Sequence, residues 1–159
     1  MDATVRPATP ADAGLIHGFV RALAEYEKLL DAVTATEADL ARALFGPRPR
    51  AFAEIAELDG APVGFALWFY SYSTFAGRHG IWLEDLFVVP QARGQGAGKA
   101  LLQALAKRCM AEGLGRLEWA VLDWNAPSIA FYDSLGAAAM DEWIIRRLSG
   151  DALRKLGNG

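Results

Sequence analysis

The sequence predicts a single α/β domain in which a mixed β-sheet is flanked by helices on both faces. The chain has 159 residues, 53% hydrophobic and 22% charged, which suits one domain, residues 1–159, with a substantial core. No internal repeat, low-complexity tract or long linker divides it. The hydrophobic patterns give the order β-α-α-β-β-β-α-β-α-β, and a further strand could lie within residues 136–142.

The N-terminal third of the chain predicts one strand followed by two helices. Residues 4–8 form the strand. Thr9 and Pro10 then suit a helix start, since threonine caps helices and proline fits the first turn. Apolar residues recur with helical spacing from there to Tyr26. A second helix covers residues 36–44, and the Gly-Pro-Arg-Pro sequence at 46–49 ends it.

The rest of the chain predicts a strand meander and then alternating helices and strands. Strands at 51–58, 63–72 and 81–89 are joined by the turn signal Asp59-Gly60 and by a second turn at 76–80. A helix containing residues 100–110 ends near Gly113, and a strand covers 117–122. A helix at 126–135, closed by Gly136, and a last strand at 143–148 complete the prediction.

A glycine-rich segment between a predicted strand and a predicted helix is the most informative motif. Residues 91–99 read Gln-Ala-Arg-Gly-Gln-Gly-Ala-Gly-Lys. Glycines let backbone approach a ligand, and a helix N-terminus offers unpaired N–H groups to phosphate. A P-loop with this spacing would need glycine at position 93 and Ser or Thr at position 100, where this chain has Arg93 and Ala100. A dinucleotide fingerprint would need glycine at position 99, where this chain has Lys99. A glycine turn without a ligand is the alternative.

A second motif follows about 30 residues later, at 123–136, and reads Asp-Trp-Asn-Ala-Pro-Ser-Ile-Ala-Phe-Tyr-Asp-Ser-Leu-Gly. By itself it predicts a helix capped by Asn125, with Tyr132 either a core aromatic or a functional group. Together, Gln-x-x-Gly-x-Gly-x-Gly and Asn-x-x-Ser-x-x-Phe-Tyr-x-x-x-Gly resemble the acetyl-CoA motifs of the GNAT N-acetyltransferases. The resemblance implies that acetyl-CoA is the acetyl donor and that Tyr132 protonates the departing thiolate. The residues it implies for cofactor binding are Leu86, Phe87 and Val88 by backbone, Arg93, Gly94, Gln95, Gly96, Ala97, Gly98, Lys99, Asn125, Ala126, Pro127, Ser128 and Tyr132.

The resemblance extends over most of the chain and weakens after Gly136. Leu-Ala-Glu-Tyr-Glu-Lys at 23–28, Leu-Glu-Asp at 83–85 and Val-Leu-Asp-Trp-Asn at 121–125 are similar to the diamine acetyltransferase branch, closer to thialysine N-acetyltransferases than to spermidine/spermine enzymes. That branch implies a homodimer, with residues 149–156 near the partner. It also implies a set of substrate-binding residues: Tyr26, Glu27, Glu84, Glu118, Trp119 and Ala120.

Two adjacent carboxylates in a predicted strand, Glu84 and Asp85, are candidates for acid–base chemistry. Because strand side chains alternate, they are expected to face opposite sides. Buried carboxylates are costly unless paired or functional, although both could be ordinary solvated acids. A lysine-like amine has a pKa near 10.4, so only roughly 1 in 2,500 molecules is neutral at pH 7, and transfer needs a proton acceptor. The resemblance assigns this role to Glu84, acting through a water molecule, and leaves Asp85 to serve structure or the other face of the sheet.

Composition narrows the remaining function classes. A net charge of −3 argues against nucleic acid as the main partner. The N-terminus lacks signal-peptide features and no apolar run reaches a membrane-spanning length, so a cytoplasmic protein without a membrane partner is expected. Cys109 is the only cysteine and suits a buried thiol in a reducing compartment, while His17 and His79 lack metal-ligand spacing, so no metal is expected.

The sequence thus predicts an acetyl-CoA-dependent N-acetyltransferase that acts on a small primary amine, with thialysine or a lysine-like amino acid as first choice. Direct transfer in a ternary complex is expected because no cysteine lies near the motifs. Diamines or polyamines such as spermidine and spermine are the second choice. A protein acceptor and a non-catalytic CoA-binding module are further alternatives.

Overall fold

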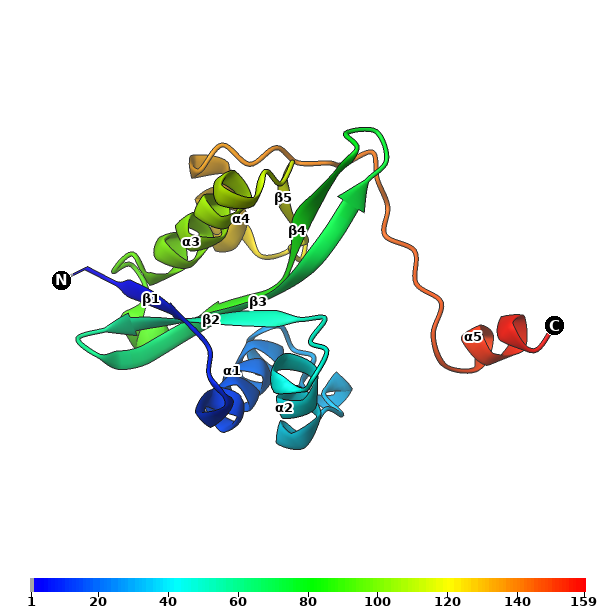
Figure 1. The fold of residues 1–159 in the computed structure, drawn as a ribbon, viewed down its shortest axis with the longest axis horizontal. Coiled ribbons are helices and arrows are strands. Elements are labelled where there is room, and N and C mark those ends of the chain that lie inside the picture. The colour runs from blue at the N-terminus through cyan, green and yellow to red at the C-terminus, as the bar shows by residue number, and fades with distance from the viewer. Residues whose placement is uncertain (1) are drawn as a thin grey trace. The chain divides into compact units, whose positions relative to one another are not determined.

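A computed structural model describes residues 2–159, which form two compact units, residues 2–120 and 121–159. The larger unit contains a five-stranded sheet in the order β1-β2-β3-β4-β5 (Figure 1). The strands are β1 (Thr4–Pro7), β2 (Phe52–Leu58), β3 (Ala61–Ser73), β4 (Arg78–Val88) and β5 (Leu117–Trp119). Neighbours among β1 to β4 are antiparallel, whereas β5 runs parallel to β4. The mixed sheet predicted from the sequence is confirmed.

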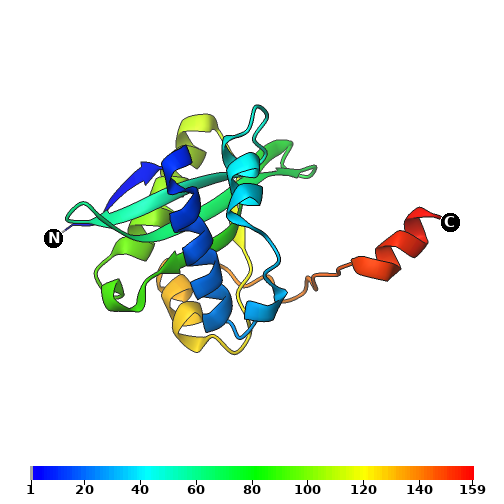
Figure 2. The same cartoon turned by 90° about the horizontal axis from the view of Figure 1, so that it is seen from below.

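Helices cover both faces of this sheet (Figures 1 and 2). One face carries α1 (Ala13–Tyr26) and α2 (Glu37–Phe45), while α3 (Ala97–Glu112) crosses the other. Short 3-10 turns are η1 (Pro10–Asp12), η2 (Leu30–Ala32) and η3 (Pro90–Ala92). The helix predicted to start at Thr9 therefore begins with a 3-10 turn, and the helix predicted over 100–110 begins earlier, inside the glycine-rich segment. The other boundaries in this unit agree with prediction within a few residues, although β5 stops short of residue 122.

The core beneath α1 and α2 is aromatic. Phe19 of α1 stacks on Phe65 of β3, with ring centroids 5.7 Å apart, and contacts Phe87 of β4 at 5.9 Å. Ile16 and Ile55 in the same cluster are fully buried. Burying a large aliphatic or aromatic side chain contributes roughly 1.5–3 kcal/mol, so this cluster fixes α1 against the strand that carries Glu84 and Asp85.

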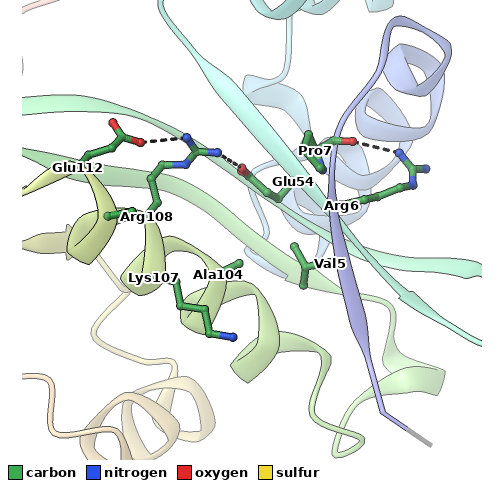
Figure 3. Close-up of a pocket in the computed structure, with 9 residues that line it drawn as sticks. Val5, Arg6, Pro7, Glu54, Ala104, Lys107, Arg108 and Glu112 are labelled. Carbon is green, nitrogen blue, oxygen red and sulfur yellow. Dashed lines mark hydrogen bonds and ion pairs between the residues drawn. The ribbon is translucent and has the colours of Figure 1, made fainter.

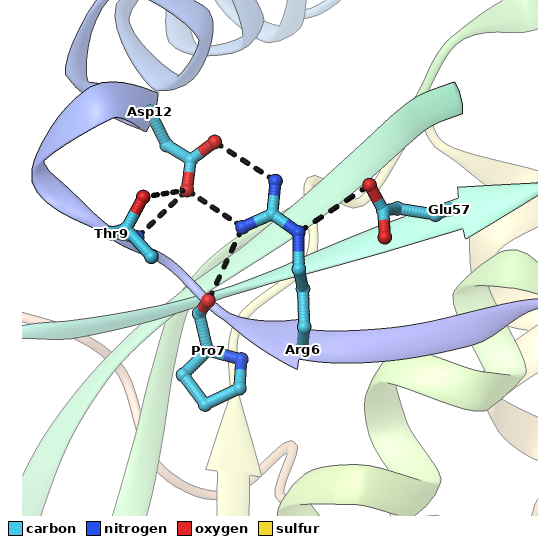
Figure 4. Close-up of polar contacts among 5 residues, drawn as sticks. All are labelled: Arg6, Pro7, Thr9, Asp12 and Glu57. Carbon is cyan, nitrogen blue, oxygen red and sulfur yellow. Dashed lines mark hydrogen bonds and ion pairs between the residues drawn. The ribbon is translucent and has the colours of Figure 1, made fainter. Parts of the chain in front are cut away.

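An ion pair joins the first strand to the turn before α1 (Figure 4). Arg6 donates two hydrogen bonds to Asp12, at 2.8 and 3.0 Å, and its Nε lies 3.4 Å from Glu57. The backbone N–H of Thr9 donates to the same Asp12 carboxylate at 2.7 Å. These contacts hold the pKa of Asp12 at about 2, because the Arg6 hydrogen bonds favour its charged form.

The smaller unit, residues 121–159, contains the helices α4 (Ala126–Ser134) and α5 (Gly150–Gly157). Asn125 caps α4, since its side chain accepts the Ser128 N–H at 3.4 Å, and Gly136 follows the helix with a φ of 83°.

The prediction of a strand at 143–148 is wrong, because these residues have no regular structure. The further strand considered at 136–142 does not form either. A strand exists only when another backbone satisfies its hydrogen bonds, and no other segment described in residues 121–159 is a strand. Trp143, Ile144 and Ile145 are exposed.

Candidate functional site

The glycine-rich segment forms the connection between η3 and α3 and presents a helix N-terminus. Gly94 and Gly96 have φ angles of 77° and 88°, a left-handed conformation that side chains with a Cβ atom rarely adopt. No atom lies within 4 Å of the position that a Cβ would take at either glycine, so backbone conformation rather than crowding requires glycine here.

Backbone N–H groups gather at the start of α3. The N–H of Ala100 donates to the Gly96 oxygen at 2.9 Å, which closes the first turn of the helix. The N–H groups of Ala97, Gly98 and Lys99 belong to this first turn, where an α-helix provides no acceptor, and they lie at the positive end of the helix dipole. The segment therefore fits the phosphate-binding role predicted for it.

A β-bulge marks the middle of β4. Leu67 of β3 pairs with Asp85 and the next residue, Trp68, pairs with Leu83, so Glu84 is the extra residue without an opposite partner. The pairing of β4 with β5 also ends here, at Leu83 and Trp119. The Glu84–Val88 stretch thus has no strand partner on the β5 side among residues 2–159. The backbone of Leu86, Phe87 and Val88, predicted to bind the cofactor, lies on this open edge.

The bulge corrects the expectation for the two adjacent carboxylates. Directly opposed residues of an antiparallel pair share a face, so the partly buried Asp85 lies on the face of Leu67, which belongs to the core beneath α1. Leu83 shares the other face with Trp68, whose ring lies 5.1 Å from the Arg108 guanidinium of α3. Simple alternation therefore fails between residues 83 and 85, so it no longer supports the expectation that Glu84 and Asp85 face opposite sides.

Three carboxylates form a negative cluster at this point: Glu27, Glu84 and Asp85. Burial, and then the charges of Glu84 and Glu27, raise the pKa of Asp85 to about 6. Burial also raises the pKa of Glu27. Glu84 is exposed and accepts a hydrogen bond from the Trp82 indole at 3.3 Å. The expected role of Asp85, in structure or on the other face of the sheet, did not include this cluster, since no sequence pattern marks a bulge.

Tyr26 and Glu27 are held in place by the way α1 ends. The N–H of Leu29 donates to the Ala24 oxygen at 2.7 Å, and that of Lys28 donates to the Glu25 oxygen at 3.1 Å. This pattern is a Schellman motif, in which Lys28 takes the left-handed position with a φ of 61°. Glycine usually occupies that position, so the strained Lys28 indicates a tightly determined helix end.

The predicted substrate residues of β5 have different surroundings. Trp119 pairs in register with Leu83, immediately before the bulge, and Ala120 ends the larger unit. The carboxylate of Glu118 forms an ion pair with Arg116 at 3.2 Å. Trp119 and the bulge therefore lie together, whereas Glu118 already has a cationic partner.

The predicted residues of the smaller unit lie at the start and along α4. Asn125 caps the helix, Ala126, Pro127 and Ser128 form its first turn, and Tyr132 is half-buried with its ring 5.5 Å from that of Phe131. The roles of these residues toward a cofactor stay predictions.

Other features of the larger unit lie apart from this site. A cavity of about 370 Å³ between β1 and α3 is lined in part by Val5, Glu54 and Arg108 (Figure 3). Its α3 residues begin at Ala104, two turns beyond Gly96. Cys109 is buried, which raises its thiol pKa and makes it a poor nucleophile.

Within residues 2–159 the structure has no cluster of His, Cys, Asp or Glu suited to a metal ion. The same residues include no helix with the length and apolar character that crossing a lipid bilayer requires.

Comparison with known proteins agrees with this arrangement. The profile of the Acetyltransferase (GNAT) family matches residues 18–137. A thialysine N-epsilon-acetyltransferase from Bos taurus is 39% identical over 96% of this chain and 95% of its own length. An L-ornithine N5-acetyltransferase from Arabidopsis thaliana is 31% identical over 98% of this chain and 88% of its own length. Among solved structures, an integron cassette protein from the mobile metagenome of V. cholerae superposes with a TM-score of 0.81, at 26% identity, over 100% of this chain and 99% of its own.

Proposed function

Since the chain belongs to the acetyltransferase (GNAT) family and is an N-acetyltransferase, we propose that its acceptor is a small amine with a second charged group, thialysine or a lysine-like amino acid first. The cluster of Glu27, Glu84 and Asp85 is the observation that carries this proposal. The negative charges of Glu27 and Glu84, which act on Asp85 electrostatically, attract an ammonium group and disfavour an acidic substrate. The names of the bovine and plant relatives also point to amino acids with a side-chain amine.

The donor in this proposal is acetyl-CoA. Its pyrophosphate binds the first-turn amides of α3 and the backbone of residues 94–99, and the open edge of β4 receives its pantetheine chain. The positive φ angles of Gly94 and Gly96 and the missing strand partner beyond Leu83 support this placement. Asn125, Ala126, Pro127 and Ser128 bind CoA in the same proposal. We treat residues 1–159 as one functional domain, because the family profile spans parts of both compact units.

The proposed chemistry is direct transfer between two bound substrates. Glu84 accepts a proton from the ammonium group through water, and the neutral nitrogen attacks the thioester carbonyl. The carbon–sulfur bond then breaks, the acetyl group stays on nitrogen, and the nitrogen gives up its second proton to become an amide. The thiolate takes the phenolic proton of Tyr132, and the second proton from nitrogen reaches the Tyr132 phenolate through water. The negative charge of the site also favours the protonated, ammonium form of the bound amine. The proton acceptor must therefore be effective near neutral pH, because the amine reacts only after it has lost a proton. Asp85, with a pKa of about 6, is suited to share the released proton with Glu84.

A panel of acceptors tests this function. Acetyl-CoA consumption is measured with thialysine, lysine, ornithine, putrescine, spermidine and spermine. Preference for an amino acid supports the proposal, whereas preference for spermidine moves the acceptor to polyamines. If none of the six amines is acetylated while acetyl-CoA binds, the small-amine acceptor is wrong and a protein lysine or N-terminus is tested next.

Glu27→Gln and Glu25→Gln provide a matched pair at the C-terminal end of α1. Glu25 is exposed and outside the carboxylate cluster. We expect Glu27→Gln to raise the KM for the amine several-fold and Glu25→Gln to leave it unchanged. Equal effects of the two changes would show that general surface charge, not the cluster, attracts the amine.

We also propose a homodimer in the cytoplasm. Trp143, Ile144 and Ile145 are 75%, 78% and 68% exposed, and Leu153 and Leu156 of α5 are exposed too. A run of large apolar side chains with a strand-like sequence is costly in water and suits burial against a second copy. Light scattering should give a dimer mass for the wild type and a smaller mass for Ile144→Asp. A monomeric wild type would refute the dimer.

A further inference from the structure

We propose that Arg93 couples the cofactor loop to the amine site by stacking on Tyr26, so that each substrate tightens binding of the other. This inference rests on the proposed function, because it assumes that the loop binds CoA and that the end of α1 borders the amine. It assigns Arg93 a positioning role toward the amine in addition to any contact with phosphate.

Arg93 follows one element of the larger unit, η3, and contacts two others, β4 and α1. It follows η3 at the beginning of the glycine-rich segment. Its Nε donates a hydrogen bond to the Val88 oxygen at 3.0 Å, at the end of β4. Its guanidinium carbon lies 5.0 Å from the centre of the Tyr26 ring and 5.8 Å from that of Phe87. Tyr26 is the last residue of α1 and precedes Glu27 of the carboxylate cluster.

The position of the Arg93 guanidinium also suits it to bind an anion. Arginine has five N–H donors in a planar fork, and here Nε is engaged by Val88 while the guanidinium carbon lies over the Tyr26 ring. Stacking on an aromatic face leaves the edge of the guanidinium for hydrogen bonds to an anion. A phosphate bound by the loop that follows would therefore meet a cation that also contacts Tyr26.

This connection has a thermodynamic consequence. A ligand that orders Arg93 also orders the Tyr26 ring beneath it, and coupling between two ligands is reciprocal. CoA should tighten amine binding by the same factor as the amine tightens CoA binding. A cation–π contact at an exposed site contributes about 0.5–1 kcal/mol, which corresponds to a factor of roughly 2–5. Tyr26 should thus affect CoA affinity although it lies on α1 and outside the loop.

A double-mutant cycle tests the contact between the two side chains. The Kd of CoA is measured by calorimetry, without amine, for the wild type, Tyr26→Leu, Arg93→Met and the double variant. We expect Tyr26→Leu to weaken CoA binding roughly 2–5-fold when Arg93 is present and less than 1.5-fold in the Arg93→Met protein. Tyr26→Phe keeps the aromatic face and loses only the hydroxyl, so it should retain the wild-type Kd. Additive effects, or an unchanged Kd in Tyr26→Leu, would overturn the proposal.

A second measurement does not depend on changing Tyr26. Binding of thialysine is measured with and without saturating CoA, which cannot donate an acetyl group. The wild type should bind thialysine more tightly with CoA, and Arg93→Met and Arg93→Lys should lose most of this gain, because lysine lacks the planar fork. Equal gains in all three proteins would refute the coupling. A wild type that binds no CoA would instead refute the proposed function.

Discussion

Replacing Asp85 by asparagine should stabilise the protein while it reduces activity. Asp85 is largely buried on β4 beside two other carboxylates, and the folded state raises its pKa from the usual 3.8 to about 6. An acid whose pKa is raised on folding binds its proton more tightly in the native state. The native state is therefore favoured at low pH and loses stability as pH rises from 3.8 through 6.

The size of the effect follows from the pKa change. A tenfold change in proton affinity corresponds to about 1.36 kcal/mol, so ionised Asp85 costs at most about 3 kcal/mol at pH 8. Residual solvent contact screens part of this cost, and we expect a gain of about 2–3 kcal/mol for Asp85→Asn. For a chain of this length the gain corresponds to a Tm increase of roughly 5–10 °C.

Urea unfolding of Asp85→Asn and wild type at pH 8 and pH 4 measures the difference. The gain should be largest at pH 8 and should fall below about 1 kcal/mol at pH 4, where the carboxyl group of the wild type is protonated in the native state. Glu25→Gln, at an exposed carboxylate outside the cluster, serves as the control. A gain that is equal at both pH values, or no gain at pH 8, would refute the account of Asp85 as a strained acid retained for function.

Three further changes test other parts of the site and fold. Tyr132→Phe should lower kcat by about 10²–10⁴-fold and change the Kd of acetyl-CoA less than twofold, and equal losses in both would contradict a role as the acid. Gly96→Ala and Gly113→Ala both force alanine to a positive φ, of 88° and 68°, and should each cost about 1 kcal/mol in thermal unfolding, but only Gly96→Ala should weaken acetyl-CoA binding. Asp12→Asn should cost about 1–2 kcal/mol at pH 7, a range that allows for the partial exposure of Arg6. Because the Asp12 pKa is lowered from 3.8 to about 2, this cost should shrink steadily as pH falls from 4 through 2, and a cost that does not change over this range would exclude the ion pair as its source.

Sequence patterns predicted the elements whose causes are local. The Asp59-Gly60 signal gives the β2–β3 hairpin, and both residues have positive φ as such a turn requires. Thr36 caps α2 by accepting the Asp39 N–H at 3.2 Å. The periodic apolar residues of α1 include the buried Ile16 and Phe19. In each case the information lies within a few neighbouring residues.

Features that depend on distant parts of the chain were not predicted. The bulge at Glu84 arises from the register between β3 and β4, and it brings Asp85 into the carboxylate cluster with Glu27, nearly 60 residues earlier. The stacking of Arg93 on Tyr26 likewise joins residues far apart in sequence. The 143–148 segment has a good strand pattern, but a strand also needs a partner, which the pattern cannot supply.

Initial velocities with both substrates varied test the central claim, direct acetylation of a small cationic amine, most directly. Thialysine and acetyl-CoA are varied at pH 8, and mass spectrometry locates the acetyl group in the product. The account predicts intersecting reciprocal plots and an acetyl group on the side-chain nitrogen. Parallel plots with an acetylated protein intermediate, or no acetylated amine, would contradict it.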